Sequence, residues 1–143
     1  MSTLNGALSA SATGLSAERV RIEAAVSNLA NADTTRGADG QPYRRRDVVL
    51  AADQTPTFDQ ALGNTGAVGV RVAEVVQDAQ APRMKYDPTN PDADAKGYVA
   101  LPNVSAPEEM VNMLGAARAY QANLTAVSMI RDLIQKAISL GNS

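Results

Sequence analysis

Three aspartates are the residues of this 143-residue sequence best placed to do chemistry. Asp87, Asp92 and Asp94 lie in the stretch YDPTNPDADAKG, whose second half resembles the beginning of a calcium-binding loop. The match then fails, because Asn103 stands where a twelve-residue loop needs a bidentate glutamate. Paired carboxylates could also serve acid–base catalysis, but nothing in their spacing marks one of them as buried. We therefore predict a proline-braced, aspartate-rich turn in place of a metal or catalytic site.

Two further stretches have charge or glycine patterns that could bind phosphate. Arg44, Arg45 and Arg46 form a basic run after one tyrosine, in an acidic chain, so a solvated or interface-facing run is favoured over nucleic-acid binding. The segment GNTGAVG lacks the Lys-Ser/Thr pair of a phosphate-binding loop, so its glycines indicate flexibility. We predict no nucleic-acid partner.

The composition excludes most catalytic chemistry. The sequence has no histidine, cysteine or tryptophan, which removes histidine-based triads, thiolate nucleophiles, disulfides and ordinary zinc sites. Fifteen acidic residues against thirteen basic ones give a net charge of -2, which is not the charge of a general polyanion binder. The chain is therefore predicted not to be an enzyme and to need no cofactor.

Both ends of the chain have the apolar spacing of long helices. In the first 32 residues, apolar positions recur with a 3.5-residue period from Leu4 to Leu29, which predicts a helix ending near residues 31–33. A second helix is predicted after Ser105, where Ser105 and Glu108 form a capping box, and Gly141 provides its stop. Its period is the strongest in the sequence.

Between the helices the 3.6-residue period disappears, and Gly and Pro interrupt the pattern. Short strands are predicted around Val48–Leu50, Val68–Val72 and Tyr98–Leu101, where β-formers alternate or follow a glycine. The stretch 53–69 is predicted to be a loop or a variable insertion.

The predicted fold is mainly α with a small β-rich insertion. Residues 1–33 and 105–143 would form an antiparallel coiled-coil pair, and residues 34–104 a central strand and loop region. The residues predicted to pack between the two helices of one subunit are Leu8, Leu15, Ile22 and Leu29 on the first and Tyr120, Leu124, Val127 and Ile134 on the second.

The second helix has more apolar surface than one such pairing can cover. Leaving three large aliphatic side chains in water forfeits roughly 1.5 to 3 kcal/mol each, so either the middle region or other protein chains must cover them. The small residues of the first helix favour other chains, because they let neighbouring helices approach closely from several directions. The predicted contacts with neighbouring subunits are Leu114, Ile130, Leu133 and Leu140.

Several motifs occur together in one order along the whole chain. They are SNLANADT at 27–34, DGQPYRR at 39–45, YDPTNPDADAKGYVALPNV at 86–104, EEMVNM at 108–113 and ARAYQANL at 117–124. With these motifs the sequence resembles the bacterial flagellar basal-body rod family, most closely its proximal-rod members. The stretch 53–69 is the part that resembles the family least.

The resemblance implies a structural subunit that assembles helically around the export channel of the proximal rod and transmits torque in motility. It implies as partners other copies of the chain, companion rod proteins, the adaptor between the rod and the membrane ring, and the flagellar type III export apparatus. It implies a location in the periplasm-spanning rod of the basal body. The N-terminal residues lack the basic and apolar regions of a secretory signal, so export without a cleaved leader is expected.

The family signature maps onto the end of the first helix, at Asn28, Leu29, Ala30 and Asn31. Its asparagines could cap the last helical carbonyl groups or contact another subunit. A different class of function also stays open on the sequence alone: a secreted adaptor or chaperone-like helical module that forms a discrete oligomer.

Overall fold

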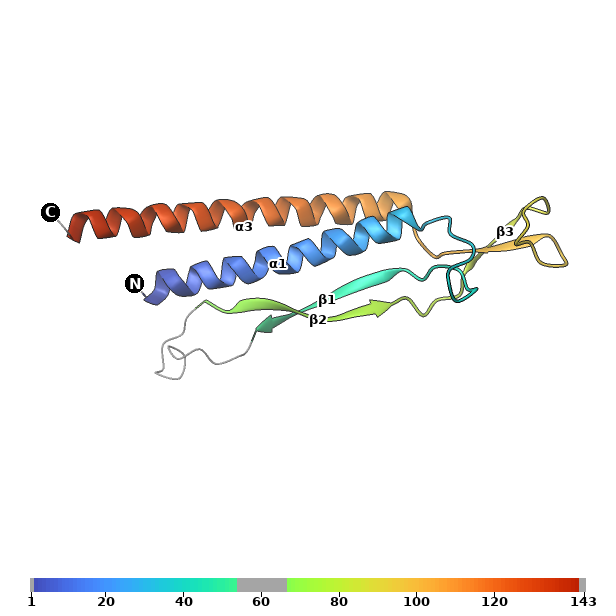
Figure 1. Ribbon diagram of the computed structural model, residues 1–143, viewed down its shortest axis with the longest axis horizontal. Helices are drawn as coiled ribbons and strands as arrows, with labels where there is room; N and C mark the ends of the chain where they lie inside the picture. Colours follow the sequence, from blue (N-terminus) through green and yellow to red (C-terminus); the bar gives the residue numbers. More distant parts are fainter. Residues whose placement is uncertain (1, 54–66, 142–143) are drawn as a thin grey trace. The chain divides into compact units, whose positions relative to one another are not determined.

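The computed structural model describes residues 2–53 and 67–141. They form two long helices, and four strands lie between these helices in the sequence (Figure 1). The helices are α1 (Ser2–Ala30) and α3 (Ala106–Gly141), and the strands are β1 (Arg46–Asp53), β2 (Gly69–Gln77), β3 (Arg83–Tyr86) and β4 (Tyr98–Leu101). The two predicted helices and the strand region between them are confirmed, whereas the coiled-coil pairing stays a prediction. Most of the predicted loop at 53–69 lies outside the described residues.

The chain divides into two compact units, and each helix contributes to both. Unit 1 comprises Met1–Val20, Val49–Glu74 and Gly115–Ser143, and unit 2 comprises Arg21–Val48 and Val75–Leu114. The predicted division into a helical domain and a central region, at residues 33 and 105, stays a prediction.

The helix ends that belong to unit 2 are closed by local hydrogen bonds. Beyond the end of α1, the Asn31 side chain donates to the Ser27 carbonyl group at 2.8 Å and accepts from the Thr34 hydroxyl group at 3.2 Å. Ser105 directly precedes α3, and its carbonyl oxygen accepts the Glu109 amide at 3.0 Å. Asn31 therefore satisfies a terminal carbonyl group, as a helix-capping residue does.

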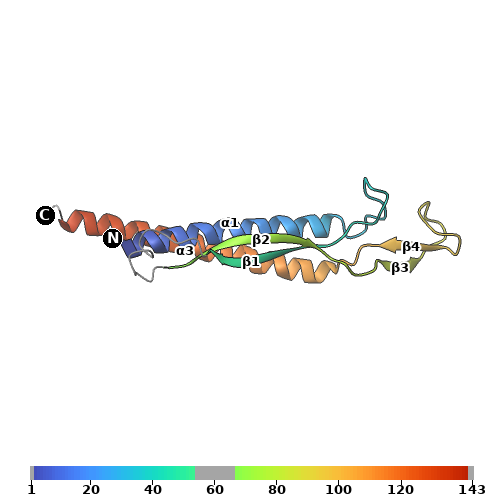
Figure 2. The ribbon, with the colours of Figure 1, turned by 90° about the horizontal axis from the view of Figure 1, so that it is seen from below.

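In unit 2, β3 and β4 form an antiparallel hairpin in which Tyr86 lies opposite Tyr98 (Figure 2). The sequence did not predict β3, because the segment Arg83–Tyr86 contains no β-branched residue and two cationic side chains. The two tyrosine rings meet edge to face, with centroids 5.3 Å apart. The other two strands, β1 and β2, are hydrogen-bonded to each other.

The loop of this hairpin requires glycine at position 97. Gly97 has a φ of 81°, in the left-handed region, and a Cβ there would lie 2.9 Å from Cε2 of the Tyr86 ring. The absence of a side chain thus permits both the turn and the close approach of the ring.

We expect Gly97→Ala to lower the free energy of unfolding by about 1–2 kcal/mol, since it adds left-handed strain and a steric clash. Urea denaturation followed by circular dichroism measures this. Gly115→Ala is the matched control, because Gly115 is helical and has open space around its Cα. That control should raise the free energy of unfolding by up to about 1 kcal/mol through helix propensity. Equal effects of the two substitutions would contradict the prediction.

In unit 1, α1 approaches α3 and β2 closely at two neighbouring residues. A Cβ at Gly14 would lie 2.9 Å from Nδ2 of Asn123 on α3. Next to it, the Thr13 hydroxyl group accepts the Val70 amide of β2 at 3.1 Å and donates to the Ala10 carbonyl group at 2.8 Å. Gly14, which costs helix propensity, is therefore also a point of close helix contact.

Alanine is the commonest buried residue among the described residues. Ala17, Ala25 and Ala116 are at most 5% exposed, and Asn28 and Glu109 are the buried polar residues among the described part of the chain. Within the same part, neither helix is sufficiently apolar along its length to span a membrane. Because buried polar groups are costly unless they are hydrogen-bonded, Asn28 and Glu109 mark the site of greatest interest.

Candidate functional site

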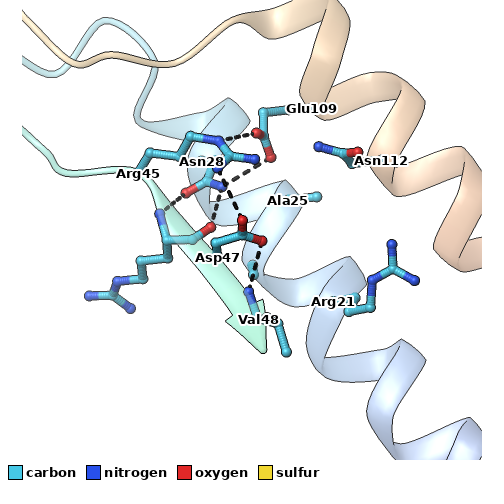
Figure 3. A pocket seen from close by; sticks show the side chains of 10 residues that line it. Arg21, Ala25, Asn28, Arg45, Asp47, Val48, Glu109 and Asn112 are labelled. Carbon is cyan, nitrogen blue, oxygen red and sulfur yellow. Dashed lines mark hydrogen bonds and ion pairs between the residues drawn. The ribbon is translucent and has the colours of Figure 1, made fainter. Parts of the chain in front are cut away.

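Asn28, near the end of α1, is 1% exposed and uses the full hydrogen-bonding capacity of its side chain. Its Nδ2 donates to the Arg46 carbonyl oxygen at 2.8 Å and to Oε2 of Glu109 at 3.0 Å. Its Oδ1 accepts from the Arg46 amide at 2.8 Å and from the Tyr43 hydroxyl group at 2.9 Å. Figure 3 shows Asn28 beside the paired side chains of Arg45 and Glu109, at the point where α1, β1 and α3 meet within unit 2.

The partners of Asn28 fix the orientation of its amide group. The Arg46 amide can only donate, whereas the Arg46 carbonyl and the Glu109 carboxylate can only accept. Arg46 is the first residue of β1. The Asn28 side chain bonds both the amide and the carbonyl group of Arg46, as the backbone of a neighbouring strand would. A carboxylate could not replace this amide without facing two acceptors.

Tyr43 extends the hydrogen bonds toward the helix. Because its single hydroxyl proton goes to Asn28, the 3.1 Å contact with the Ser27 hydroxyl group requires Ser27 to be the donor. The Arg46 guanidinium lies over the face of the Tyr43 ring, 5.9 Å from the ring centroid, in a cation–π contact. Tyr43 is thereby held between a hydroxyl group, an amide and a cation.

Glu109, in the first turn of α3, is 2% exposed and forms an ion pair with Arg45. Oε1 of Glu109 accepts from Nε of Arg45 at 2.7 Å, and Nη1 of Arg45 lies 3.5 Å from Asp47. Burial lowers the pKa of the Arg45 guanidinium, but the hydrogen bond and charge of Glu109, with Asp47, outweigh it and raise the pKa above its ordinary value. The Arg45 guanidinium is therefore charged at all physiological pH values.

The residue after β2 holds the backbone of Arg45 in place. The Asp78 amide donates to the Arg45 carbonyl group at 2.8 Å. The Asp78 carboxylate in turn accepts from the Gln80 amide and the Asn103 side chain, and these hydrogen bonds lower its pKa below the ordinary value. Arg45 is therefore fixed at both its main chain and its side chain.

A pocket of about 140 Å³ opens beside these residues within unit 2. Its walls include Arg21, Asp47 and Asn112 together with Asn28 and Glu109 (Figure 3). We name the hydrogen-bonded residues of this site the polar network: Ser27, Asn28, Tyr43, Arg45 and Glu109. Of these, Asn28, Arg45 and Glu109 line the pocket.

The three aspartates considered above for metal binding or catalysis, Asp87, Asp92 and Asp94, form hydrogen bonds or ion pairs within the chain. Asp92 accepts from the Thr35 hydroxyl group at 2.7 Å and pairs with Arg36 at 3.1 Å. Asp94 accepts the amides of Lys96 and Tyr98, and Asp87 accepts the Thr89 hydroxyl group at 2.8 Å. The described residues contain no group of three acidic side chains arranged to hold a metal ion. The carboxylates act as turn and loop acceptors, in line with the predicted braced turn.

The predicted seam and interface residues differ in exposure. Leu124 is 44% exposed, and the other predicted seam residues are half-buried: Leu8, Leu15, Ile22, Leu29, Tyr120, Val127 and Ile134. Among the predicted interface residues, Leu114, Leu133 and Leu140 are 54–77% exposed and Ile130 is half-buried. Which of these residues pack within a subunit and which face a neighbour stays a prediction.

Sequence reasoning missed the polar network as a unit. It treated Asn28 as a cap or a subunit contact, and Arg45 as part of a solvated or interface-facing basic run. One sequence signal could have pointed to Glu109: it lies four residues before Met113 and seven before Ala116, and so shares a helix face with apolar residues. A lone acid on a buried face requires a cationic partner.

Comparison with known proteins gives two family models and a set of full-length relatives. Residues 1–38 match the model described as flagella basal body rod protein, and residues 95–140 match flagellar basal body rod FlgEFG protein C-terminal. Flagellar basal-body rod protein FlgC of Salmonella typhimurium is 43% identical over 90% of this chain and 91% of its own length. FlgC of Bacillus subtilis is 41% identical (94% and 95%), and FlgC of Borreliella burgdorferi is 39% identical (96% and 97%).

The resemblance inferred from the motifs is therefore confirmed, and both family models include parts of the helices that build the polar network. A discrete adaptor or chaperone-like module is not favoured by these relatives, which are all named as rod proteins. The chain belongs to the FlgC family of flagellar basal-body rod proteins.

Proposed function

We propose that this chain is a structural, non-catalytic subunit of the proximal rod, which assembles helically around the flagellar export channel and transmits torque. Its partners are other copies of itself, companion rod proteins, the adaptor to the membrane ring and the export apparatus. It reaches the periplasm-spanning rod of the basal body without removal of a signal peptide. The names of its relatives support the rod assignment.

The observation that carries the assembly proposal is the exposed apolar surface of α3. Leu114, Leu133 and Leu140 are each more than half exposed in the single chain. Side chains of this size contribute roughly 1.5 to 3 kcal/mol each when they are fully buried, so covering them favours association strongly. A helical assembly covers such residues by heterologous contacts, which continue from one subunit to the next without closing.

In this proposal the predicted seam residues make contacts within one subunit, and the predicted interface residues make contacts between subunits. Half-buried residues such as Leu15 and Val127 pack between α1 and α3 of one subunit as an antiparallel coiled coil. The exposed leucines of α3 contact neighbouring subunits. In this arrangement residues 1–33 and 105–143 form the axial domain, and residues 34–104 the outer region.

We expect Leu133→Asp to abolish incorporation into the rod while leaving the isolated chain folded. The side chain is 54% exposed, so the change should alter the free energy of unfolding by no more than about 0.5 kcal/mol. In an assembled rod the same charge would be buried without a partner. Swimming-halo assays of a strain lacking its own rod subunit, complemented with the variant, measure the effect.

Gln121→Asp is the control for Leu133→Asp, since it adds the same charge to an exposed position of α3 outside the predicted interface. It should support motility. Normal halos and normal basal bodies with Leu133→Asp, at wild-type protein levels, would show that Leu133 does not face a neighbour.

A further inference from the structure

Both long helices have buried alanines. Ala25 on α1 is 5% exposed in unit 2, and in unit 1 Ala17 is 2% and Ala116 is 0% exposed. These alanines, and half-buried aliphatic residues such as Leu15 and Val127, lie on helices whose apolar residues recur at heptad spacing, so the helices present similar surfaces after each heptad. Packing between such surfaces discriminates weakly between alignments that differ by a heptad, so another feature must select one of them.

The polar network has the properties of such a feature. A buried ion pair adds little net stability compared with apolar residues of similar volume, because desolvation offsets the attraction. Separating its members is costly, however, since each would stay buried without a partner. Glu109 is 2% exposed and depends on Asn28 and Arg45 for its two short hydrogen bonds.

We propose that the polar network fixes the axial alignment of α1 against α3. Asn28 on α1 bonds the backbone amide and carbonyl group of Arg46. The preceding residue, Arg45, is therefore held against α1. Glu109 is the contribution of α3. A shift of one heptad would place Ala116 or Pro102 opposite Asn28, and neither side chain can accept its Nδ2 proton or neutralise Arg45.

A second contact, within unit 1, is compatible with the same alignment. Gly14 approaches Asn123 closely, as described above. Gly14 and Asn28 are fourteen residues apart on α1, and Glu109 and Asn123 are also fourteen residues apart on α3. Fourteen residues are two heptads, so each contact favours the same heptad pairing. This inference concerns one chain and does not depend on rod assembly.

Disulfide cross-linking tests the proposal in the full chain, which has no cysteine of its own. Ala25→Cys with Asn112→Cys reports the observed alignment, because both residues line the pocket beside the network (Figure 3). Ala25→Cys with Ala119→Cys reports a shift of one heptad. We expect only the first pair to cross-link rapidly in the otherwise unchanged chain.

Two network variants are then compared in both cysteine backgrounds. Asn28→Leu, Arg45→Met and Glu109→Leu together should keep the helical circular dichroism signal but raise shifted cross-linking by about tenfold, because no buried charge then selects the alignment. Glu109→Ala with Ala116→Glu moves the acid by one heptad and should make the shifted pair the main product.

The proposal would be overturned if the apolar triple variant cross-linked only in the observed alignment. It would equally be overturned if that variant were unfolded, since the network would then supply stability and not alignment. Retention of the observed alignment after the acid is moved, in a chain that is still helical, would also contradict it. More cross-linking of the shifted cysteine pair in the triple variant supports the proposal, even if the variant with the relocated acid does not fold.

Discussion

Asn28→Asp should destabilise the chain by about 3–5 kcal/mol, although the two side chains have nearly the same shape. The substitution replaces the Nδ2 donor with a carboxylate oxygen. That oxygen would face the Arg46 carbonyl group and the Glu109 carboxylate, which the amide contacts at 2.8 and 3.0 Å. Urea denaturation at pH 7 measures the loss in free energy of unfolding.

The pH dependence identifies the cause of this loss. Burial beside Glu109 raises the pKa of the new carboxyl group in the folded state above its unfolded value. The folded state therefore binds a proton more tightly than the unfolded one, so the loss should diminish as the pH falls from 7 through the ordinary range of carboxyl groups. Once protonated, the group can again donate to one of its two acceptors.

Asn31→Asp is the matched control for Asn28→Asp, because it makes the same chemical change three residues away. Asn31 is half-buried and loses one capping hydrogen bond to Ser27, which is worth about 1–2 kcal/mol. An effect of Asn28→Asp no larger than that of its control, or one that did not vary with pH, would contradict the assigned hydrogen bonds.

The long helices could be predicted because their information is local. The 3.5-residue period and the Ser105 cap predicted α1 and α3 to within a few residues. The strand β3 was not predictable in the same way, since Tyr86 is the only strand-favouring residue of Arg83–Tyr86 and the segment pairs with β4. Its pairing depends on Gly97, whose positive φ a sequence pattern does not reveal.

The polar network was not predictable because its contacts are distant in sequence. Asn28 reaches Arg46 across 18 residues and Glu109 across 81. The sequence left open two roles for the asparagines of the signature, and the structure separates these residues. Asn31 caps the helix, whereas Asn28 joins α1 to β1 and α3 of its own chain. A contact of the signature with another subunit stays a prediction.

Glu109→Ala is the second change with a large expected effect, about 3 kcal/mol, because it removes one member of a buried ion pair. It leaves Nε of Arg45 and one Nδ2 proton of Asn28 without their acceptor. The estimate is at the low end of the range for such pairs, since the Arg45 side chain is 24% exposed and also reaches Asp47. Glu108→Ala, on the exposed neighbour in the same turn, should cost no more than about 1 kcal/mol, the contribution of an acidic side chain near a helix N-terminus.

A double-mutant cycle with Arg45→Met separates the ion pair from other effects of Glu109→Ala. If the pair is as the structure shows, removing both charges should cost less than the sum of the two single changes, with a coupling of about 1–3 kcal/mol. Strict additivity would mean that Arg45 and Glu109 do not interact in the folded chain. Because destabilisation of 1–2 kcal/mol already changes protein abundance several-fold in cells, Glu109→Ala should also reduce motility, and Glu108→Ala should not.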